Sequence, residues 1–258
     1  MRVLITGGNG YVGHSLTNKL KYPDYSVVSV TRSDFDLCDQ QQTADFFKHN
    51  YFDVIIHTAV AGGNRLKKHD ASVIDQNLTM YYNLVANEKS FGKLITFGSG
   101  AELYAKETPY GISKHIIRES IKLKSNYYNL RIFGVFDENE LDTRFIKSNI
   151  IRYINKQPMH IHQDKFMDFI YMDDLVELVK LYLKRDDLPK EINCNNLTMY
   201  KLSQIAEIIN NLSDYKVDIV IEAFGLDSGY TGEWSGIIPD NWIGIENGIK
   251  KVYNNLKA

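Results

Sequence analysis

Short runs of β-branched and other apolar residues alternate with longer amphipathic stretches through the first half of the chain. The run Val54-Ile55-Ile56 is apolar at every position, which is typical of a strand covered by helices on both faces. Strands of this kind, separated by helix-length amphipathic segments, predict a parallel sheet with crossover helices. We expect strands at 2–6, 26–31, 53–58, 93–98 and 127–132, and helices at 11–20, 40–49, 74–89 and 110–124.

The pattern changes after Gly134, where shorter apolar runs are separated by polar turns. Asp173 and Asp174 are expected to start a helix that continues to residue 183, because an acidic side chain there can cap free N–H groups. Residues 224–244, which include Trp234 and Trp242, are expected to be ordered but irregular. The remaining expectations are helices at 143–155, from about 199 and at 245–256, and strands at 159–162, 169–171 and 216–220.

Composition narrows the classes of partner. The 258 residues are 44% hydrophobic and carry a formal net charge of -2 without a block of like charge, so neither nucleic acid nor a membrane surface is an expected partner. Cys38 and Cys194 lie outside any metal-ligand spacing, so we expect no metal site and no disulfide framework. No apolar run has the length of a signal peptide or a bilayer span, which favours a cytoplasmic protein.

A glycine-rich segment follows the first expected strand and opens the first expected helix. Its spacing is G-x-x-G-x-x-G. Gly7 permits a tight turn, Gly10 lets the backbone approach a pyrophosphate, and Gly13 lets the helix lie close to the sheet. The segment therefore predicts a dinucleotide site made by Gly7, Gly10, Tyr11, Val12 and Gly13.

The end of the second strand bears on the choice of cofactor. An acidic side chain at this tip would bind the ribose hydroxyls of NAD, but the chain has Arg32, whose guanidinium suits the 2′-phosphate of NADP. Asp34 and Asp36 follow closely, so NADP is favoured and NAD stays possible.

Tyr110 and Lys114 lie four residues apart at the start of an expected helix, so they share one face of it. The lysine ammonium can approach both the phenol and a bound cofactor ribose, and it would lower the pKa of Tyr110 toward the working pH. Ser99 follows the fourth strand at the edge where open α/β sheets bind ligands, and its hydroxyl can donate to the substrate oxygen that Tyr110 protonates.

These residues, in this order, resemble the extended branch of the short-chain dehydrogenase/reductase superfamily, which contains NAD-dependent epimerases, dehydratases and ketoreductases of nucleotide sugars. The likeness extends to the segments 53–59 and 168–175. It implies a Rossmann fold, a homodimer and a catalytic triad of Ser99, Tyr110 and Lys114. It also implies cofactor contacts by Asp36, Leu37, Thr58, Ala59, Val60 and Asn77.

The resemblance implies a division of the chain into two parts. We expect an α/β protein with a doubly wound parallel sheet, in which residues 1–134 form the NAD(P)-binding core. Residues 135–258 are expected to supply the remaining sheet elements and a small, trimmed substrate lobe packed on that core.

The departures from the family pattern concern the substrate. Met167 stands where many relatives have an arginine that meets the nucleotide diphosphate, and Arg144 and Arg152 are alternative diphosphate ligands. Glu102 and Glu107, the acids between Ser99 and Tyr110, are not adjacent, which argues against a dehydratase. His115, His160 and His162 are conceivable additional bases.

The sequence therefore favours NADP-dependent reduction of a 4-keto group on a nucleotide-activated deoxysugar, with Tyr110 as the proton donor. Two alternatives stay open. One is a nucleotide-sugar epimerase with tightly bound NAD, and the other is a non-catalytic dinucleotide-sensing regulator.

Overall fold

The structure is a computed structural model that describes residues 1–63 and 70–257. The chain forms two compact units. Unit 1 comprises Met1–Arg131 and Val179–Ile192, and unit 2 comprises Ile132–Leu178 and Asn193–Ala258. The assignment of cofactor binding to residues 1–134 and of substrate binding to the remainder stays a prediction.

Unit 1 is built on a parallel sheet, as the pattern of buried strands predicts. Within the described residues the sheet has six strands in the order β2-β1-β3-β4-β5-β9. The strand order reverses at β1, because β2 lies on one side of it and β3 on the other, and both pairs are parallel. In open α/β sheets, ligands bind outside the carboxyl ends of the strands at such a reversal, which here lies between β1 and β3. The strands are β1 (Arg2–Thr6), β2 (Ser26–Val30), β3 (Phe52–His57), β4 (Phe91–Ser99), β5 (Tyr127–Ile132) and β9 (Glu191–Cys194).

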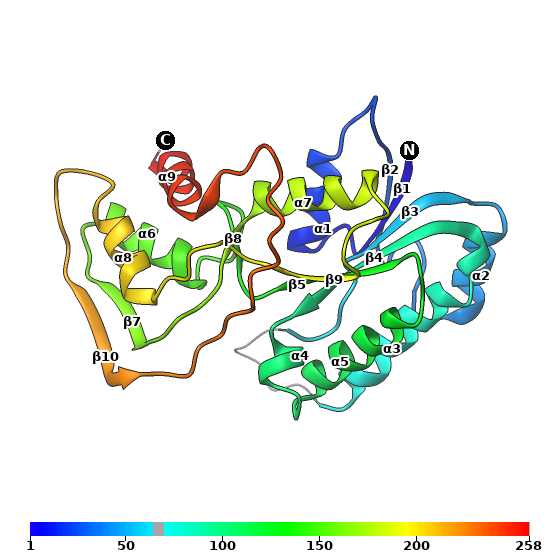
Figure 1. Cartoon of the computed structure of the whole chain (residues 1–258), viewed down its shortest axis with the longest axis horizontal. Coiled ribbons are helices and arrows are strands. Elements are labelled where there is room, and N and C mark those ends of the chain that lie inside the picture. The colour runs from blue at the N-terminus through cyan, green and yellow to red at the C-terminus, as the bar shows by residue number, and fades with distance from the viewer. Residues whose placement is uncertain (64–69, 258) are drawn as a thin grey trace. The chain divides into compact units, whose positions relative to one another are not determined.

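Helices cover both faces of this sheet. In Figure 1, α2, α3 and α5 lie on one face and α1 lies on the other. The side chains of Val54, Ile55 and Ile56 are at most 1% exposed, which confirms burial of β3 from both sides. The doubly wound Rossmann arrangement is thereby confirmed. The helices are α1 (Tyr11–Lys19), α2 (Gln40–Lys48), α3 (Ser72–Val85), the 3-10 turn η1 (Glu88–Ser90), α4 (Ala101–Tyr104) and α5 (Pro109–Lys122).

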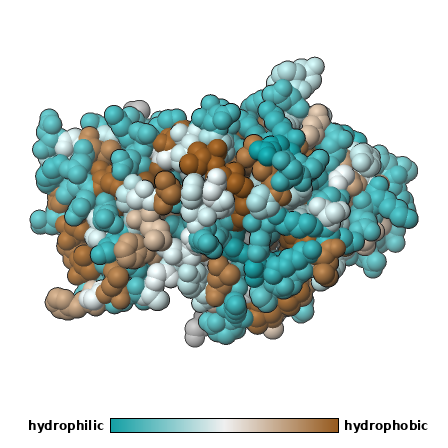
Figure 2. Space-filling view, in the orientation of Figure 1, coloured by the Kyte–Doolittle hydropathy of each residue, from teal (hydrophilic) through white to brown (hydrophobic). Residues whose placement is uncertain are grey.

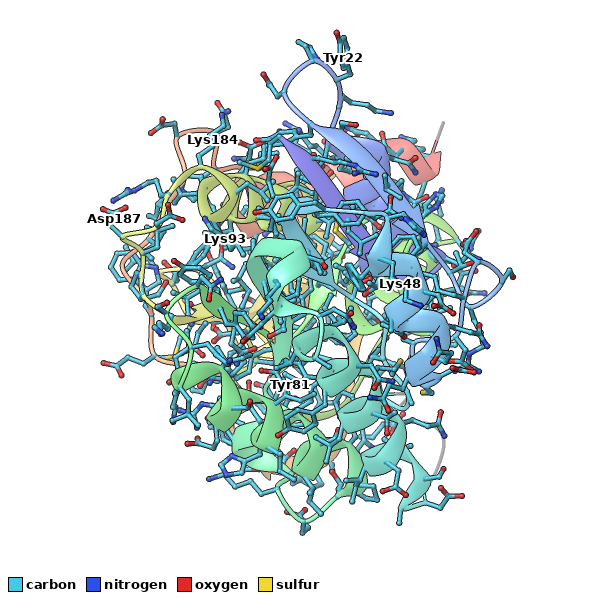
Figure 3. All side chains as sticks on the ribbon, turned by 90° about the vertical axis from the view of Figure 1, so that its right-hand side faces the viewer. Tyr22, Lys48, Tyr81, Lys93, Lys184 and Asp187 are labelled. Carbon is cyan, nitrogen blue, oxygen red and sulfur yellow. The ribbon has the colours of Figure 1, made fainter. Side chains whose placement is uncertain are left out.

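A buried lysine on β4 fixes the end of a helix that follows much later in the chain. Lys93 is 7% exposed, and its ammonium donates to the carbonyl oxygens of Tyr182 and Arg185 at 2.6 and 2.9 Å. It also pairs with the Asp186 carboxylate at 2.7 Å. Figure 3 labels Lys93 together with Lys184 and Asp187 of the same region. A cation is favourable at a helix C-terminus, where carbonyl groups lack helical partners, so Lys93 stabilises the end of α7 (Met172–Lys184).

In the described part of unit 2, two small sheets and three helices pack around an apolar core, and residues 172–178 of α7 also belong to this unit. In the part of the chain that the structure describes, β6 pairs with β8 and β7 with β10, both in parallel. Ile150, Ile205 and Ile249 are fully buried and lie in one cluster, which joins the three helices. The elements are β6 (Val135–Phe136), α6 (Phe145–Ile154), β7 (Met159–Asp164), β8 (Ile170–Tyr171), α8 (Leu202–Asn210), β10 (Ile219–Leu226) and α9 (Gly244–Lys257).

The expected cap at the start of α7 acts on a different helix. Asp173 and Asp174 do lie in the first turn of α7. The Asp174 carboxylate, however, accepts the backbone N–H groups of Ile243 and Gly244 at 2.7 and 3.0 Å. Since α9 begins at Gly244, Asp174 caps the entry to α9 across about seventy residues of sequence. Local capping statistics could not anticipate this long-range contact.

Some expected boundaries in the second half were wrong. The strand expected at 216–220 runs over Ile219–Leu226, so it enters the segment expected to be irregular. The helix expected from about 199 begins at Leu202. The short strand Glu191–Cys194 was missed because four residues contain too little periodicity for recognition.

The strand β10 presents apolar side chains to solvent. Val220, Ile221, Phe224 and Leu226 are exposed, and Figure 2 shows apolar surface at the lower left, where Figure 1 draws β10. On the paired strand β7, Ile161, which lies opposite Ile221, is buried in the core of unit 2. The outer part of the small sheet is therefore more apolar than an ordinary solvated edge.

Unit 2 also holds a carboxyl group whose burial makes stability depend on pH. Burial raises the pKa of Glu140 from 4.5 to about 8. A pKa that is higher in the folded state than in the unfolded state favours folding while the group is protonated. This part of the free energy of unfolding is therefore lost as pH rises from about 4.5 through about 8.

We expect Glu140→Gln to unfold at a higher denaturant concentration than the wild type at pH 8, with a free energy of unfolding that is larger by on the order of 1 kcal/mol. Near pH 4.5 the two proteins should differ little. Urea titrations at both pH values measure the effect. Glu207→Gln, an exposed change on α8, is the control, and an equal gain in both variants would contradict the assignment to burial.

Two findings concern membranes and metals. No helix within residues 1–63 and 70–257 combines the length and apolarity that a membrane crossing requires. The same residues contain no cluster of three or more His, Cys, Asp or Glu side chains arranged to hold a metal ion.

Candidate active site

The glycine segment forms a tight turn between β1 and α1. Gly7 has a φ of 73°, a conformation that other residues rarely adopt. A Cβ atom on Gly7 would lie 2.6 Å from the backbone nitrogen of Ala59, and one on Gly13 would lie 2.4 Å from the Gly7 carbonyl oxygen. The turn therefore has room for glycine alone at these two positions, and α1 lies close to the strand ends as expected.

The start of α1 fits the phosphates of a dinucleotide. Gly10 precedes the helix in an extended conformation and has no side chain to cap the free N–H groups. The first turn, which begins with Tyr11 and Val12, carries no acidic residue. Because a helix N-terminus offers unpaired N–H donors and a positive dipole, this turn suits an anionic ligand.

The segment after β3 lies against the glycine turn. The Thr58 hydroxyl donates to the carbonyl oxygen of Thr6 at 2.6 Å, and the backbone of Ala59 contacts Gly7 closely. Val60 is 46% exposed at its side chain. These residues line the carboxyl ends of β1 and β3, where the resemblance places the cofactor.

Asn77 on α3 holds the next part of this segment. Its side-chain oxygen accepts the N–H of Ala61 at 2.7 Å, and its amide nitrogen donates to the Ala61 carbonyl at 3.0 Å and to the Ser113 hydroxyl at 2.9 Å. The residue is 2% exposed. With its amide engaged on both sides, Asn77 supports the loop after β3, and its contact with a cofactor stays a prediction.

The end of β2 leaves a guanidinium at the surface. The side chain of Arg32 is 71% exposed and lies 3.9 Å from the Asp36 carboxylate. The Asp34 carboxylate accepts the N–H and hydroxyl of Thr31, which lowers the pKa of Asp34 and fixes the turn. Both acids near the tip are therefore held in local contacts, while Arg32 extends outward.

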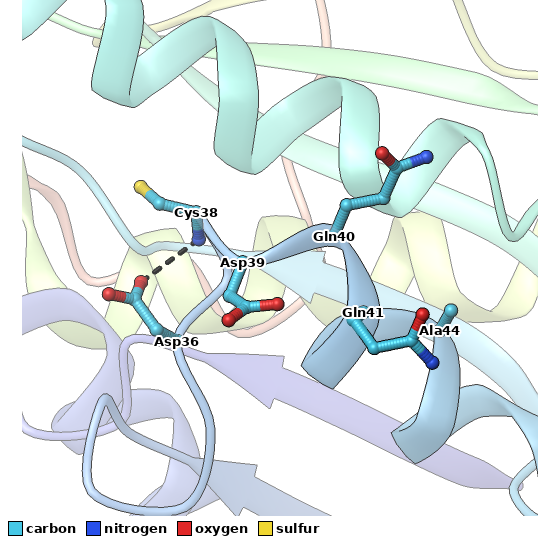
Figure 4. A pocket seen from close by; sticks show the side chains of 6 residues that line it. All are labelled: Asp36, Cys38, Asp39, Gln40, Gln41 and Ala44. Carbon is cyan, nitrogen blue, oxygen red and sulfur yellow. Dashed lines mark hydrogen bonds between the residues drawn. The ribbon is translucent and has the colours of Figure 1, made fainter.

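Asp36 also lines a pocket beside the start of α2 (Figure 4). Its carboxylate accepts the N–H of Cys38 at 2.9 Å. Leu37, for which the resemblance implies a cofactor contact, has its side chain in the core and is 7% exposed. A contact of Leu37 with a cofactor would therefore involve its backbone.

Ser99 is the last residue of β4, and α4 starts two residues later. The Ser99 hydroxyl accepts the backbone N–H of Ala101 at 3.2 Å, and the Ser99 N–H donates to the Glu102 carboxylate at 3.2 Å. A hydroxyl that accepts one hydrogen bond still carries a hydrogen that it can donate. Ser99 is thus held in place at the carboxyl edge of the sheet, and its hydroxyl can still donate a hydrogen bond.

Tyr110 and Lys114 occupy the first turns of α5, as predicted. Thr108 caps this helix by accepting the N–H of Gly111 at 3.1 Å. The Lys114 nitrogen lies 5.8 Å from the centre of the Tyr110 ring and donates to the Phe97 carbonyl oxygen at 2.7 Å. Since Phe97 lies two residues before Ser99, Lys114 links the phenol to the end of β4.

Two further glycines contact the Tyr110 ring. Gly62 and Gly63 have φ angles of 80° and 78°. A Cβ on Gly63 would lie 3.3 Å from the ring and 3.5 Å from the Tyr110 hydroxyl. The loop that Asn77 holds thus covers part of the phenol, a relation that the sequence did not indicate.

Burial controls the charges around the lysine. It lowers the pKa of Lys114 to about 8, against the opposing charge of Glu102. Burial and the Lys114 charge lower the pKa of His57, on β3, to about 3, and His57 shares a 2.8 Å hydrogen bond with the Thr6 hydroxyl. Near pH 7 the site therefore holds a neutral imidazole and a lysine that is close to titration.

The candidate substrate residues of unit 2 are separated from one another. Arg144 precedes α6 and Arg152 lies in its last turn, so they are about 12 Å apart along the helix axis. Arg152 donates to the Pro158 carbonyl at 3.4 Å. His160 and His162 share the Glu222 carboxylate at 3.4 and 3.0 Å on the small sheet. None of these contacts assigns a substrate role.

The buried motif around Asp168 has a structural role in unit 2. The Asp168 carboxylate accepts the side-chain N–H of Asn195 at 3.0 Å and the backbone N–H of Gly232 at 2.8 Å. Met167, at the position of the expected arginine, is 8% exposed and lies in the core cluster. Asp168 therefore holds two distant segments together beside an apolar side chain.

The doubly wound sheet, the glycine turn and the helix that carries Tyr110 and Lys114 define a dinucleotide-binding enzyme fold of the extended short-chain dehydrogenase/reductase type. The model of the NAD dependent epimerase/dehydratase family matches residues 3–195, and the chain belongs to this family. The resemblance stated from the sequence is confirmed, and with it an NAD(P)-dependent enzyme class that modifies nucleotide sugars.

Individual relatives are distant. The CDP-abequose synthase of Yersinia pseudotuberculosis is 25% identical over 248 residues, which cover 85% of this chain and 87% of that protein. The GDP-mannoheptose C4 reductase of Campylobacter jejuni, solved with NADP bound, has 18% identity and a TM-score of 0.79 over 100% of this chain and 98% of its own. The UDP-glucose 4-epimerase of Thermotoga maritima has 17% identity and a TM-score of 0.76 over 100% and 99%.

Proposed function

We propose that the protein is an NADP-dependent reductase of a 4-keto group on a nucleotide-activated deoxysugar. The observation that carries this proposal is the arrangement of Tyr110 and Lys114 on the first turns of α5, tied through Phe97 to the strand end that bears Ser99. A ketone reduction needs a proton donor and a hydrogen-bond donor at the same oxygen. Tyr110 and Ser99 supply these two groups.

The cofactor, when bound, supplies the hydride. The chain's own residues bind it through the glycine turn and α1, and the Lys114 ammonium favours the phenolate form of Tyr110 after proton transfer. The Ser99 hydroxyl orients the substrate carbonyl. The absence from 100–109 of an adjacent pair of acids favours a reductase over a dehydratase. The C4 reductase with the same fold supports this choice.

Arg32 supports NADP over NAD. Its guanidinium is 71% exposed and lies 3.9 Å from the Asp36 carboxylate, whereas the Asp34 carboxylate is engaged with Thr31. We expect Arg32→Ala to weaken NADPH binding about tenfold or more and to leave NADH binding nearly unchanged, since one charged contact to phosphate contributes on the order of 1.5–3 kcal/mol. Fluorescence titration of both cofactors measures the ratio. Arg152→Ala is a control for loss of a cation, and equal weakening of both cofactors by Arg32→Ala would contradict the assignment.

The proposed function is tested with a panel of substrates. Purified protein is incubated with NADPH and with UDP-, GDP-, CDP- and dTDP-linked 4-keto-deoxysugars, and NADPH consumption is followed by its absorbance. Stoichiometric consumption with at least one sugar is the expected result. Conversion of a nucleotide sugar with no net NADPH consumption would instead identify an epimerase, and cofactor binding without turnover of any panel member would support the sensing regulator. A homodimer and a cytoplasmic location stay predictions.

A further inference from the structure

Four charged residues of unit 1 form a series of ion pairs next to the candidate site, called the charge ladder below. Glu102 is fully buried, and its carboxylate accepts the Arg131 guanidinium at 2.7 Å. Arg131 also pairs with Glu191 at 3.2 Å, and Glu191 pairs with Arg118 at 2.6 Å. The ladder therefore alternates acidic and basic groups from the interior to the partly exposed face of α5.

The inner end of this ladder touches the candidate site directly. The Glu102 carboxylate accepts the backbone N–H of Ser99 at 3.2 Å and lies beside the Asn129 amide at 3.3 Å. A Cβ on Gly98 would lie 2.4 Å from the same carboxylate oxygen, so glycine is required there for close approach. Glu102 thus holds the loop that follows β4 in place from the interior of unit 1.

Glu102 faces a defined set of charges. Arg131 approaches from β5, and Lys114 and Arg118 act on it from α5. Lys114 in turn faces Glu102 from α4, His57 from β3 and the Tyr110 ring on its own helix. Because His57 is neutral in this environment, Glu102 is the negative charge that opposes the loss of the Lys114 proton.

We propose that Glu102 is a positioning residue of the reaction: its carboxylate fixes the Ser99 loop and acts as the buried counter-ion that keeps Lys114 protonated. This inference rests on the proposed function for its catalytic meaning. Full burial of Glu102 separates its role from that of an acid or base that contacts the substrate. The carboxylate acts through Ser99 and Lys114.

The two parts of the role are separated by two substitutions. Glu102→Gln retains an oxygen that accepts the Ser99 N–H but removes the charge. Glu102→Asp retains the charge but shortens the reach to Ser99. Glu191→Gln removes an equal charge one step further along the ladder and is the matched control, since Arg131 retains Glu102 as its partner.

The protonation of Lys114 is measured by competitive labelling of the full-length protein with acetic anhydride over a range of pH, followed by peptide mass spectrometry. The anhydride reacts with the neutral amine, so the labelling midpoint reports the lysine itself and requires no substrate. We expect the midpoint near 8 in the wild type to fall by about one unit in Glu102→Gln and to change little in Glu102→Asp and Glu191→Gln. The alkaline limb of kcat/KM is expected to move in the same direction.

An unchanged Lys114 midpoint in folded Glu102→Gln, or an equal fall in Glu191→Gln, overturns the proposal. If Glu102→Gln does not fold, Glu102→Asp decides: a fall of about one unit despite its retained charge overturns the counter-ion role. A lower Lys114 labelling midpoint in Glu102→Gln, together with no turnover of any sugar, would support the counter-ion role of Glu102 and contradict the reductase function. A failure of the counter-ion proposal is therefore distinguishable from a failure of the proposed function.

Discussion

Replacement of Tyr110 by phenylalanine is expected to lower kcat for ketone reduction by about 10²- to 10⁴-fold, the range that a positioned general acid contributes. The phenyl ring can occupy the same space against Gly62 and Gly63. The hydroxyl that protonates the substrate oxygen is the group that is lost. Affinity for NADPH should stay close to that of the wild type, because the glycine turn and α1 are unchanged.

The measurement combines steady-state kinetics with a cofactor titration on the same preparation. Tyr104→Phe removes a hydroxyl from a 49% exposed tyrosine at the end of α4 and is the matched control. It should retain wild-type turnover. A Tyr110→Phe enzyme that reduces the ketone at the wild-type rate would remove Tyr110 from the mechanism.

Replacement of Gly13 by alanine is expected to weaken NADPH binding by at least about tenfold and to destabilise the fold by about 1–3 kcal/mol. The added methyl group would meet the Gly7 carbonyl oxygen at 2.4 Å and the Thr58 hydroxyl at 2.5 Å. Because these atoms belong to the backbone turn and to a side chain that is itself hydrogen-bonded, α1 must move away from the strand ends. Its N-terminus would then no longer face the pyrophosphate.

Isothermal titration with NADPH and urea unfolding measure the two effects separately. Gly229→Ala is the control, because the nearest atom to its new methyl group would be 3.6 Å away, an ordinary contact. We expect near wild-type values for it in both assays. A folded Gly13→Ala protein with undiminished affinity for NADPH would show that the cofactor binds elsewhere.

Several features of the site could be predicted from neighbouring residues alone. Thr6 to Gly13 combine a buried strand, a glycine turn and a helix start within a single short segment, so their physical meaning is local. Tyr110 and Lys114 lie one helical turn apart, and the helix brings them together without help from the rest of the fold. The strand expected at 93–98 put Ser99 directly after its end, and in the structure Ser99 is the last residue of β4.

Other features needed the folded chain. The sequence shows Glu102 only as an acid between Ser99 and Tyr110. Its pairing with Arg131 joins residues 29 positions apart across the sheet, which no local pattern indicates. Asn77 reaches Ala61 and Ser113 from a third element. The family resemblance implied a cofactor contact for Asn77, which stays a prediction, but it did not indicate these contacts within the protein.

By itself, the sequence determined the α/β class, the glycine turn and the pairing of Tyr110 with Lys114, because strand and helix periodicities and one-turn spacings act over a few residues. Only the tertiary structure decided that Asp174 caps α9, that Lys93 ends α7 and that Glu102 lies beneath Ser99. The physical reason is that a buried charge must find its partner wherever the chain packs, and no local pattern records which distant segment supplies it.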